Sequence, residues 1–356
     1  KGDWAGPYNG ERCLKIDLKG EEVYVTTIAL ELEVFAKMGR WNAFQKIKRQ
    51  LKPMKKLLII DTYNFLHRAY HALPSTFRDA EGSPTNAVYG VTSMIINVLD
   101  QVKPNYIFEA LDSREPTFRV EEFTQYKAQR KPMEEDLEVQ IPKVLEILDA
   151  FGIKSIVVDG YEADDIIGTV TKKFEKEVEV VIVSNDRDLW QLAGNGTTIM
   201  VPGKKGAMEW VGEKEVDAKL GFDACKIADY KGLKGDSSDN IPGVYGIGEK
   251  TATKLIQEYG SVEEIYRNLD KVTPDSLRKK LEESTEQALM SKKLAQLIMD
   301  VPLSVELEEC RYKEFNKVAV KEVLEKYNFK SLIRRLGFED AKAKEKEVPD
   351  NQLTLL

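Results

Sequence analysis

The chain has 356 residues, of which 42% are hydrophobic and 32% are charged, and its formal net charge at pH 7 is −7. This composition excludes an intrinsically disordered chain and indicates a globular protein large enough for two lobes. The three scattered cysteines argue against a disulfide framework, and the two histidines argue against a histidine-based metal site. No apolar run reaches bilayer length and the start is unlike a signal peptide, so we expect a cytoplasmic protein without a membrane partner.

Residues 1–53 differ from the rest of the chain. We predict a β-hairpin with Gly20 at its turn, followed by an amphipathic helix near Ala29 to Arg49. Pro53 breaks this pattern, and Met54 would make a natural translation start. The sequence assigns this segment no function: it is either a small appended domain or sequence read in from upstream of the true start.

The rest of the chain alternates strands and helices, which predicts an α/β domain over residues 54–212 with a mostly parallel sheet flanked by helices. One helix opens at Ser83-Pro84 and another spans about Glu134 to Phe151. Residues 213–338 are predicted to form a helical lobe, and residues 339–356 a flexible tail. The expected strands lie at residues 57–60, 106–111, 156–158 and 180–183.

Nine acidic residues stand in five short clusters, each at the end of an apolar run or beside a glycine turn. An Asp directly after a buried strand lies at the carboxyl edge of the sheet, where α/β folds keep their sites. Carboxylates gathered without enough bases to neutralise them need hard divalent cations, and Mg²⁺ commonly keeps substrate phosphate in its shell. The clusters therefore predict metal-dependent chemistry on a phosphate. They are Asp61, Asp112, the trio Glu162, Asp164 and Asp165, the pair Asp186 and Asp188, and the pair Asp236 and Asp239.

These acids also have structural explanations. Asp164 and its neighbours begin a helix, where acids compensate the helix dipole without any ligand. Asp186 could cap the helix that follows its strand, whereas a second acid at Asp188 needs a further reason. His67 and His71 share one face of the first helix of the α/β domain, and we expect them to be structural or adjacent to substrate rather than metal ligands.

The most specific segment is a glycine-rich turn. Gly243, Gly246 and Gly248 allow a tight turn whose backbone N–H groups approach a phosphate, and this turn leads into a helix N-terminus. Two lysines on that helix, Lys250 and Lys254, add positive charge for a nucleic-acid backbone. Because no buried strand precedes the turn, it is not a dinucleotide-binding motif. Such a hairpin would position DNA without reading its sequence.

Bases alternate with aromatic side chains between residues 114 and 131. The aromatic rings could stack on nucleobases while the basic side chains reach phosphates. The alternative is an amphipathic helix with a solvated basic face. The residues assigned to nucleic-acid contact are Arg114, Phe118, Arg119, Tyr126, Lys127 and Arg130.

From Met54 to about Phe338 the chain resembles the 5′→3′ exonuclease (flap endonuclease) domain at the front of bacterial DNA polymerase I and its stand-alone bacterial and phage relatives. The resemblance implies a PIN-like α/β fold, a helical arch near residues 113–133 over the active site, and a helix-hairpin-helix-type motif over residues 240–256 that grips duplex DNA. The matching motifs arrive in the family's order: Ile60-Asp61, the block from Leu111-Asp112-Ser113-Arg114 to Arg130, Gly160-Tyr161-Glu162-Ala163-Asp164-Asp165, Asn185-Asp186-Arg187-Asp188-Leu189, and Gly235-Asp236-Ser237-Ser238-Asp239-Asn240-Ile241-Pro242-Gly243 with its GxxGIGxKTA hairpin.

The resemblance also implies a nuclease that uses two Mg²⁺ ions, for which Mn²⁺ can substitute, with K⁺ at the hairpin. Lys127 and Arg130 would be the arch residues that hold the scissile phosphate. The hairpin residues that contact DNA would be Gly243, Gly246, Gly248, Lys250, Thr251 and Lys254. The first metal site would draw on Asp61, Asp112, Glu162, Asp164 and Asp186, and the second on Asp165, Asp188, Asp236 and Asp239.

The chain departs from the family pattern at a few positions. Glu109 puts a charge inside a strand where an apolar residue is expected, and Ser184-Asn185 replaces the usual Thr-Gly. Neither change removes an expected ligand. The last five residues resemble the sliding-clamp-binding pentapeptide QLxLF, except that they end in Leu, and the alternative is a plain tail. These residues are Gln352, Leu353, Thr354, Leu355 and Leu356.

We therefore predict a structure-specific 5′→3′ exonuclease and flap endonuclease, associated with the nucleoid, that hydrolyses DNA at flaps, nicks and RNA primers in replication and repair. Two alternatives stay open: a non-catalytic module that binds flaps or duplex DNA, and a PIN-type ribonuclease, which usually lacks the glycine hairpin and the long arch. The net charge of −7 argues against nucleic acid only at face value, because the nine clustered carboxylates alone exceed it.

Overall fold

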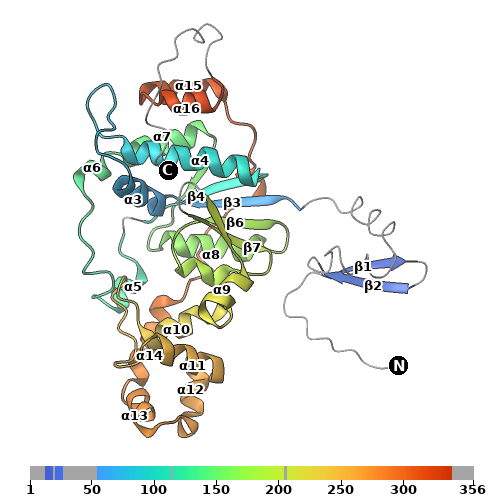
Figure 1. Ribbon diagram of the computed structural model, residues 1–356, viewed down its shortest axis with the longest axis vertical. Coiled ribbons are helices and arrows are strands. Elements are labelled where there is room, and N and C mark those ends of the chain that lie inside the picture. The colour runs from blue at the N-terminus through green and yellow to red at the C-terminus, as the bar shows by residue number, and fades with distance from the viewer. Residues whose placement is uncertain (1–12, 19–20, 27–53, 114, 204–206, 339–356) are drawn as a thin grey trace. The chain divides into compact units, whose positions relative to one another are not determined.

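The computed structural model describes residues 13–18, 21–26, 54–113, 115–203 and 207–338 (Figure 1). The chain divides into two compact units, Lys1–Met54 and Lys55–Leu356. In the first unit, β1 (Cys13–Leu18) and β2 (Glu21–Thr26) pair in antiparallel fashion, which confirms the predicted hairpin. The helix predicted near Ala29 to Arg49 and the tail lie outside the described residues.

The second unit is built on a six-stranded sheet in the order β5-β4-β3-β6-β7-β8, parallel throughout except for the last pair (Figure 1). Its central strands are runs of Leu, Ile and Val that are buried on both faces, as parallel strands covered by helices must be. The sequence did not predict β7 and β8. The strands are β3 (Lys56–Asp61), β4 (Tyr106–Ala110), β5 (Lys154–Ile156), β6 (Glu179–Val183), β7 (Thr197–Pro202) and β8 (Met208–Val211).

Two hydrophobic cores lie on the two faces of this sheet, because successive side chains of a strand point to opposite faces. Leu57 and Ile59 pack in the core that contains α8, whereas Leu58 and Ile60 pack in the core of α3, α4 and α7. Figure 1 shows these helices on either side of the strands. Their bounds are α3 (Thr62–Ala72), α4 (Asn86–Val102), α7 (Ile141–Ala150) and α8 (Ala163–Phe174).

Two of the predicted helices differ from the observed ones. The first begins at Asn86 rather than Ser83-Pro84, because Ser83 bonds back to Asp79 and so closes a turn before the helix. The helix predicted from Glu134 to Phe151 is split into α6 (Glu135–Glu138) and α7, since Pro142 has no N–H to continue the first helix into the second.

The helical segment after residue 212 divides between the two faces of the sheet. Its earlier helices join the core that contains α8, but α15 and α16 return to pack beside α4 and α7 (Figure 1). No helix in the described part of the chain is long and apolar enough to cross a membrane. The helices are α9 (Glu213–Leu220), α10 (Ile227–Lys234), α11 (Glu249–Tyr259), α12 (Val262–Arg267), α13 (Asp275–Glu283), α14 (Thr285–Ala295), α15 (Lys317–Lys326) and α16 (Lys330–Arg335).

Candidate active site

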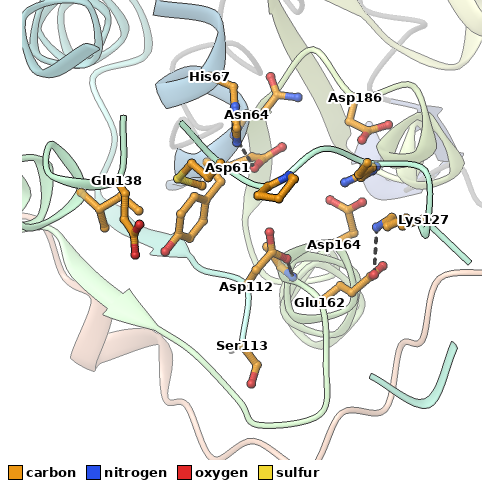
Figure 2. A pocket seen from close by; sticks show the side chains of 16 residues that line it. Asp61, Asn64, His67, Asp112, Ser113, Lys127, Glu138, Glu162, Asp164 and Asp186 are labelled. Atoms are coloured by element: carbon orange, nitrogen blue, oxygen red, sulfur yellow. Dashed lines mark hydrogen bonds and ion pairs between the residues drawn. The ribbon is translucent and has the colours of Figure 1, made fainter. Parts of the chain in front are cut away.

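A cavity of about 610 Å³ opens at the carboxyl edge of the sheet. Figure 2 shows that acidic side chains from separate elements point into it. They come from the end of β3, the loop after β4, the start of α8 and the loop after β6, as expected from their positions in the sequence. His67 also lines this cavity, next to the acids rather than among them. Glu138, at the end of α6, also lines the cavity, although the sequence gives it no role. The predicted ligands that line it are Asp61, Asp112, Glu162, Asp164 and Asp186.

Hydrogen bonds from the backbone fix several of these carboxylates. Asp112 Oδ1 accepts from the Ala163 N–H at 2.8 Å, at the open N-terminus of α8. Asp186 Oδ1 accepts from the Asp188 N–H at 2.8 Å, which holds the turn after β6. Asp61 caps α3 through a longer bond from the Asn64 N–H, at 3.4 Å.

The cavity holds more negative charge than its walls neutralise. Burial, together with the nearby charges of Asp112 and Asp186, raises the pKa of Asp61 to about 7. Burial and the charges of Asp186 and Asp61 also raise the pKa of Asp164 well above its usual value. Each shift means that the ionised form is disfavoured where it stands, so a cation bound among these side chains would relieve the repulsion.

The predicted arch segment brings two bases to the rim of the cavity. It contains the five-residue helix α5 (Phe118–Glu122) followed by turns, so it is less helical than the resemblance implies. Lys127 Nζ donates to Glu162 Oε1 at 2.8 Å (Figure 2), and Arg130 Nη2 donates to Asp239 Oδ1 at 2.6 Å. Lys127 Nζ also lies 3.9 Å from Asp239, so both bases stand beside the carboxylates and pair with them.

A second acidic group surrounds Lys231, a residue that the sequence analysis missed. Lys231 Nζ lies 2.5 Å from an oxygen of Asp236 and also contacts Asp188. Although burial alone would raise the pKa of Asp236, the Lys231 charge lowers it to about 2. The sequence does not single out this lysine, because a lysine on a helix that pairs with buried acids looks the same in sequence as a lysine exposed to solvent.

Three residues predicted to contact DNA or metal, Arg119, Asp165 and Tyr126, are buried. Arg119 is 2% exposed and Asp165 is 0% exposed, and the guanidinium donates two parallel bonds to the carboxylate at 2.7 and 2.8 Å. Tyr126 is 4% exposed, and its hydroxyl, which has one proton to donate, lies 3.2 Å from a carboxylate oxygen of both Glu162 and Asp239. None of these three side chains lines the cavity, and burial with these partners favours a structural role for them.

The other residues predicted to contact DNA differ in how exposed they are. Phe118 is half-buried, and the Arg119 guanidinium lies 4.7 Å from its ring centre. In the hairpin, Gly243 is buried and has a φ of 61°, whereas the remaining turn glycines and two lysines are exposed at the start of α11. Thr251 is half-buried there. Arg114 and the four predicted clamp-binding residues lie outside the described residues. The exposed members are Gly246, Gly248, Lys250 and Lys254.

Ion pairing divides the nine predicted ligands into two sets. Five have a basic partner: Glu162, Asp165, Asp188, Asp236 and Asp239. Within the described ranges, no ion pair reaches the other four, all of which line the cavity: Asp61, Asp112, Asp164 and Asp186.

This unpaired set of carboxylates suits a hard divalent cation. As the side chains stand, no three acidic, histidine or cysteine groups of the described chain converge closely enough to hold one metal ion. Mg²⁺ does not require such a group, since it is usually bound through one or two carboxylates while waters and phosphate complete its shell. The donor chemistry therefore fits Mg²⁺ or Mn²⁺, and it does not fit a softer metal that prefers sulfur or imidazole.

Two family models match the second unit from its start to residue 318. Residues 56–221 match the 5′-3′ exonuclease N-terminal, resolvase-like domain, and residues 222–318 match the 5′-3′ exonuclease C-terminal SAM fold. DNA polymerase I of Caldicellulosiruptor bescii is 45% identical over 80% of this chain and 34% of that protein. DNA polymerase I of Bacillus subtilis is 41% identical over 82% of this chain and 33% of that protein. The chain thus spans about a third of the length of these relatives.

Solved structures share the fold. T5 5′-exonuclease with bound zinc ions is 23% identical, with a TM-score of 0.57 over 77% of this chain and 100% of that chain. The catalytic core of Rad2 in complex with DNA substrate is 17% identical, with a TM-score of 0.54 over 79% of this chain and 92% of that chain. These likenesses confirm the predicted fold class. The two matched domains and the DNA polymerase I relatives show that the chain belongs to the 5′→3′ exonuclease family.

Proposed function

We propose that this protein is a metal-dependent, structure-specific 5′→3′ nuclease that hydrolyses DNA phosphodiesters. The observation that carries the proposal is the cavity, where four carboxylates without basic partners lie beside two bases, Lys127 and Arg130. Carboxylates suit divalent metal ions and the bases suit a phosphate. A binding module would need the bases but would have no use for unpaired, mutually repelling acids.

The side chains divide the chemistry between them. Asp61, Asp112, Asp164 and Asp186 would hold Mg²⁺ or Mn²⁺, and the acids around Lys231 would serve a second ion. Bound metal ions supply an activated water and stabilise the oxygen that leaves the phosphorus. Lys127 and Arg130, at the rim, would hold the scissile phosphate and offset the charge that develops on it.

The proposed substrates are DNA flaps, nicks and RNA primers. The hairpin fits the grip on the duplex part of such a substrate, because Gly246 and Gly248 expose their backbone and Lys250 and Lys254 stand on the following turn of α11. This surface would contact phosphates, with K⁺ as an additional bridge to the DNA backbone. Selection of the substrate would then depend on its shape rather than its base sequence.

The test is cleavage of a 5′-labelled double-flap DNA with Mg²⁺, Mn²⁺ or EDTA. We expect metal-dependent cuts near the flap junction that Asp186→Ala abolishes while flap binding is kept. Asp217→Ala, at an exposed acid of α9, is the matched control and should cut like the wild type. Tight binding without cutting under any metal would make the protein a binding module, and equal cleavage of unstructured single-stranded RNA would favour a PIN-type ribonuclease.

We also propose that the last five residues bind a sliding clamp, on the basis of their similarity to the QLxLF pentapeptide. An immobilised clamp should retain the intact protein and lose it after deletion of residues 352–356. Failure of the intact protein to bind the clamp would end this idea and leave the nuclease proposal unaffected.

A further inference from the structure

We propose that Ser184 is a positioning residue of this active site: its single hydroxyl orients the Asp61 carboxylate and the backbone of Asp186, and thereby sets the affinity of the site for divalent metal. The inference rests on the proposed function, because it assigns a metal-binding role to those two acids. It concerns Ser184-Asn185, a position at which the resemblance stated above implies Thr-Gly instead.

The hydrogen bonds of Ser184 have only one consistent direction. Its side chain is 0% exposed, and its Oγ lies 2.9 Å from the Asp186 backbone N and 2.6 Å from Asp61 Oδ2. A backbone N–H can only donate, so the hydroxyl accepts from Asp186 through a lone pair. Its one proton is then free for Asp61, which as a carboxylate can only accept. The hydroxyl therefore bridges the two acids.

The location of this bridge explains its effect. Ser184 follows β6 directly, and β6 pairs with β3 up to the partners Val183 and Ile60. Asp61 and Ser184 are the next residues of these two strands, so the hydroxyl ties the strand ends together just beyond the last backbone pair. Among the described residues, the Asp61 carboxylate accepts one other hydrogen bond, from the Asn64 N–H at 3.4 Å. Its orientation hence depends mainly on Ser184.

Asn185 strengthens the same arrangement from the other side. Its backbone N and its Nδ2 donate to the Asn64 side-chain oxygen at 3.1 and 3.2 Å. Since Asn64 also bonds Asp61, the contacts form a ring through Asp61, Ser184, Asn185 and Asn64. Loss of the hydroxyl removes the shortest hydrogen bond of this ring. The buried Asp61 carboxylate then lies beside the charges of neighbouring acids without this bond, which favours rotation of the carboxylate away from those charges.

The test compares Ser184→Ala with Ser184→Thr, which keeps the hydroxyl and restores the usual family residue. The first readout is Mg²⁺ affinity by isothermal titration calorimetry, which does not require catalysis. We expect Ser184→Ala to bind Mg²⁺ about 10- to 100-fold more weakly, the range typical of lost support behind a metal ligand, and Ser184→Thr to stay within about threefold of the wild type. Ser184→Cys, similar in size but a poor donor, should behave like Ser184→Ala and guards against a folding defect of the alanine variant.

The second readout is steady-state cleavage of the double flap at several Mg²⁺ concentrations. For Ser184→Ala we expect kcat to recover as Mg²⁺ rises, with KM for the flap unchanged, whereas a merely destabilised protein would lose activity at all metal concentrations. Wild-type Mg²⁺ affinity in both Ser184→Ala and Ser184→Cys would overturn the inference. A wild type that binds Mg²⁺ without cutting DNA would overturn the proposed function alone, and the affinity ratio would still decide the role of Ser184.

Discussion

Breaking the buried ion pair between Arg119 and Asp165 is expected to destabilise the protein without weakening its metal binding. The pair joins the arch segment to the first turn of α8, and it is almost completely shielded from water. The Arg119 side chain also donates to two carbonyl oxygens at the C-terminal end of α14, those of Leu294 and Gln296, at 2.9 Å each. Three separate segments therefore depend on one guanidinium.

The expected magnitude follows from what each substitution leaves behind. Removing one member of a buried ion pair costs about 3–5 kcal/mol, because the other charge stays buried without its partner. Arg119→Met should fall at the upper end, since it takes the guanidinium from both carbonyl oxygens and from the Asp165 carboxylate, which keeps only backbone N–H donors among the described residues. Asp165→Asn should fall at the lower end, because the guanidinium keeps the two carbonyls and Glu162 at 3.3 Å. The double variant Arg119→Met/Asp165→Leu should lose less than the sum, as it buries no unpaired charge.

The assay is urea unfolding followed by circular dichroism at 25 °C, with EDTA and with Mg²⁺. A ligand at about 100 times its Kd adds about 2.7 kcal/mol to the unfolding free energy. We expect this increment to persist in Asp165→Asn and to shrink in the matched variant Asp186→Asn, whose side chain lines the cavity. If Asp165→Asn were as stable as the wild type in EDTA but gained nothing from Mg²⁺, Asp165 would be a metal ligand and the reasoning would be refuted.

Three further predictions concern the surrounding structure. Lys231→Met should cost about 2 kcal/mol in EDTA, measured by urea unfolding, because it removes charged hydrogen bonds to two half-buried acids, and unchanged stability would contradict this. Burial raises the pKa of Glu109 above its usual 4.5, so the ionised form of Glu109 destabilises the fold. The unfolding free energy of Glu109→Gln relative to the wild type should therefore rise between pH 4.5 and neutrality. A difference that does not change with pH would contradict this. Gly243→Ala, whose new Cβ would lie 2.2 Å from the Gly235 nitrogen at a φ of 61°, should lose more than about 1 kcal/mol, whereas Gly248→Ala, with nothing within 4 Å, should not.

The sequence was sufficient for the centre of the sheet and for the edge that carries the acids. A continuous apolar run such as residues 57–60 fits a parallel strand that is covered by helices on both faces, and an Asp directly after it lies at the strand end. β7 and β8 escaped prediction because they are at the side of the sheet, where β8 exposes Trp210 and β7 ends in a proline. Their sequences are short: the apolar run of β7 has only three residues before its proline, and β8 shows no clear alternation.

The sequence predicts that the acids of the site lie close together, but it does not predict which of them pair with a basic side chain. Arg119 and Asp165 are 46 residues apart, and nothing local distinguishes this arginine from one that contacts DNA. The same holds for Lys231, which reaches two acids that the sequence places on different elements. Sequence position determines which acids share the edge, whereas long-range packing determines which of them receive a basic partner.

The unpaired acids of the cavity lead to a last prediction, that Asp164→Asn stabilises the metal-free protein. Burial and the charges of Asp186 and Asp61 raise the pKa of Asp164, and each unit of such a rise costs about 1.4 kcal/mol of stability at a pH above it. Asparagine keeps the shape and removes the charge, so unfolding at pH 8 in EDTA should require more urea than in the wild type. Added Mg²⁺ should reverse the order, because it stabilises only the protein that keeps the carboxylate. If the variant were less stable than the wild type in EDTA, the Asp164 carboxylate would stabilise the metal-free fold, and the argument that its charge needs a bound cation would be wrong.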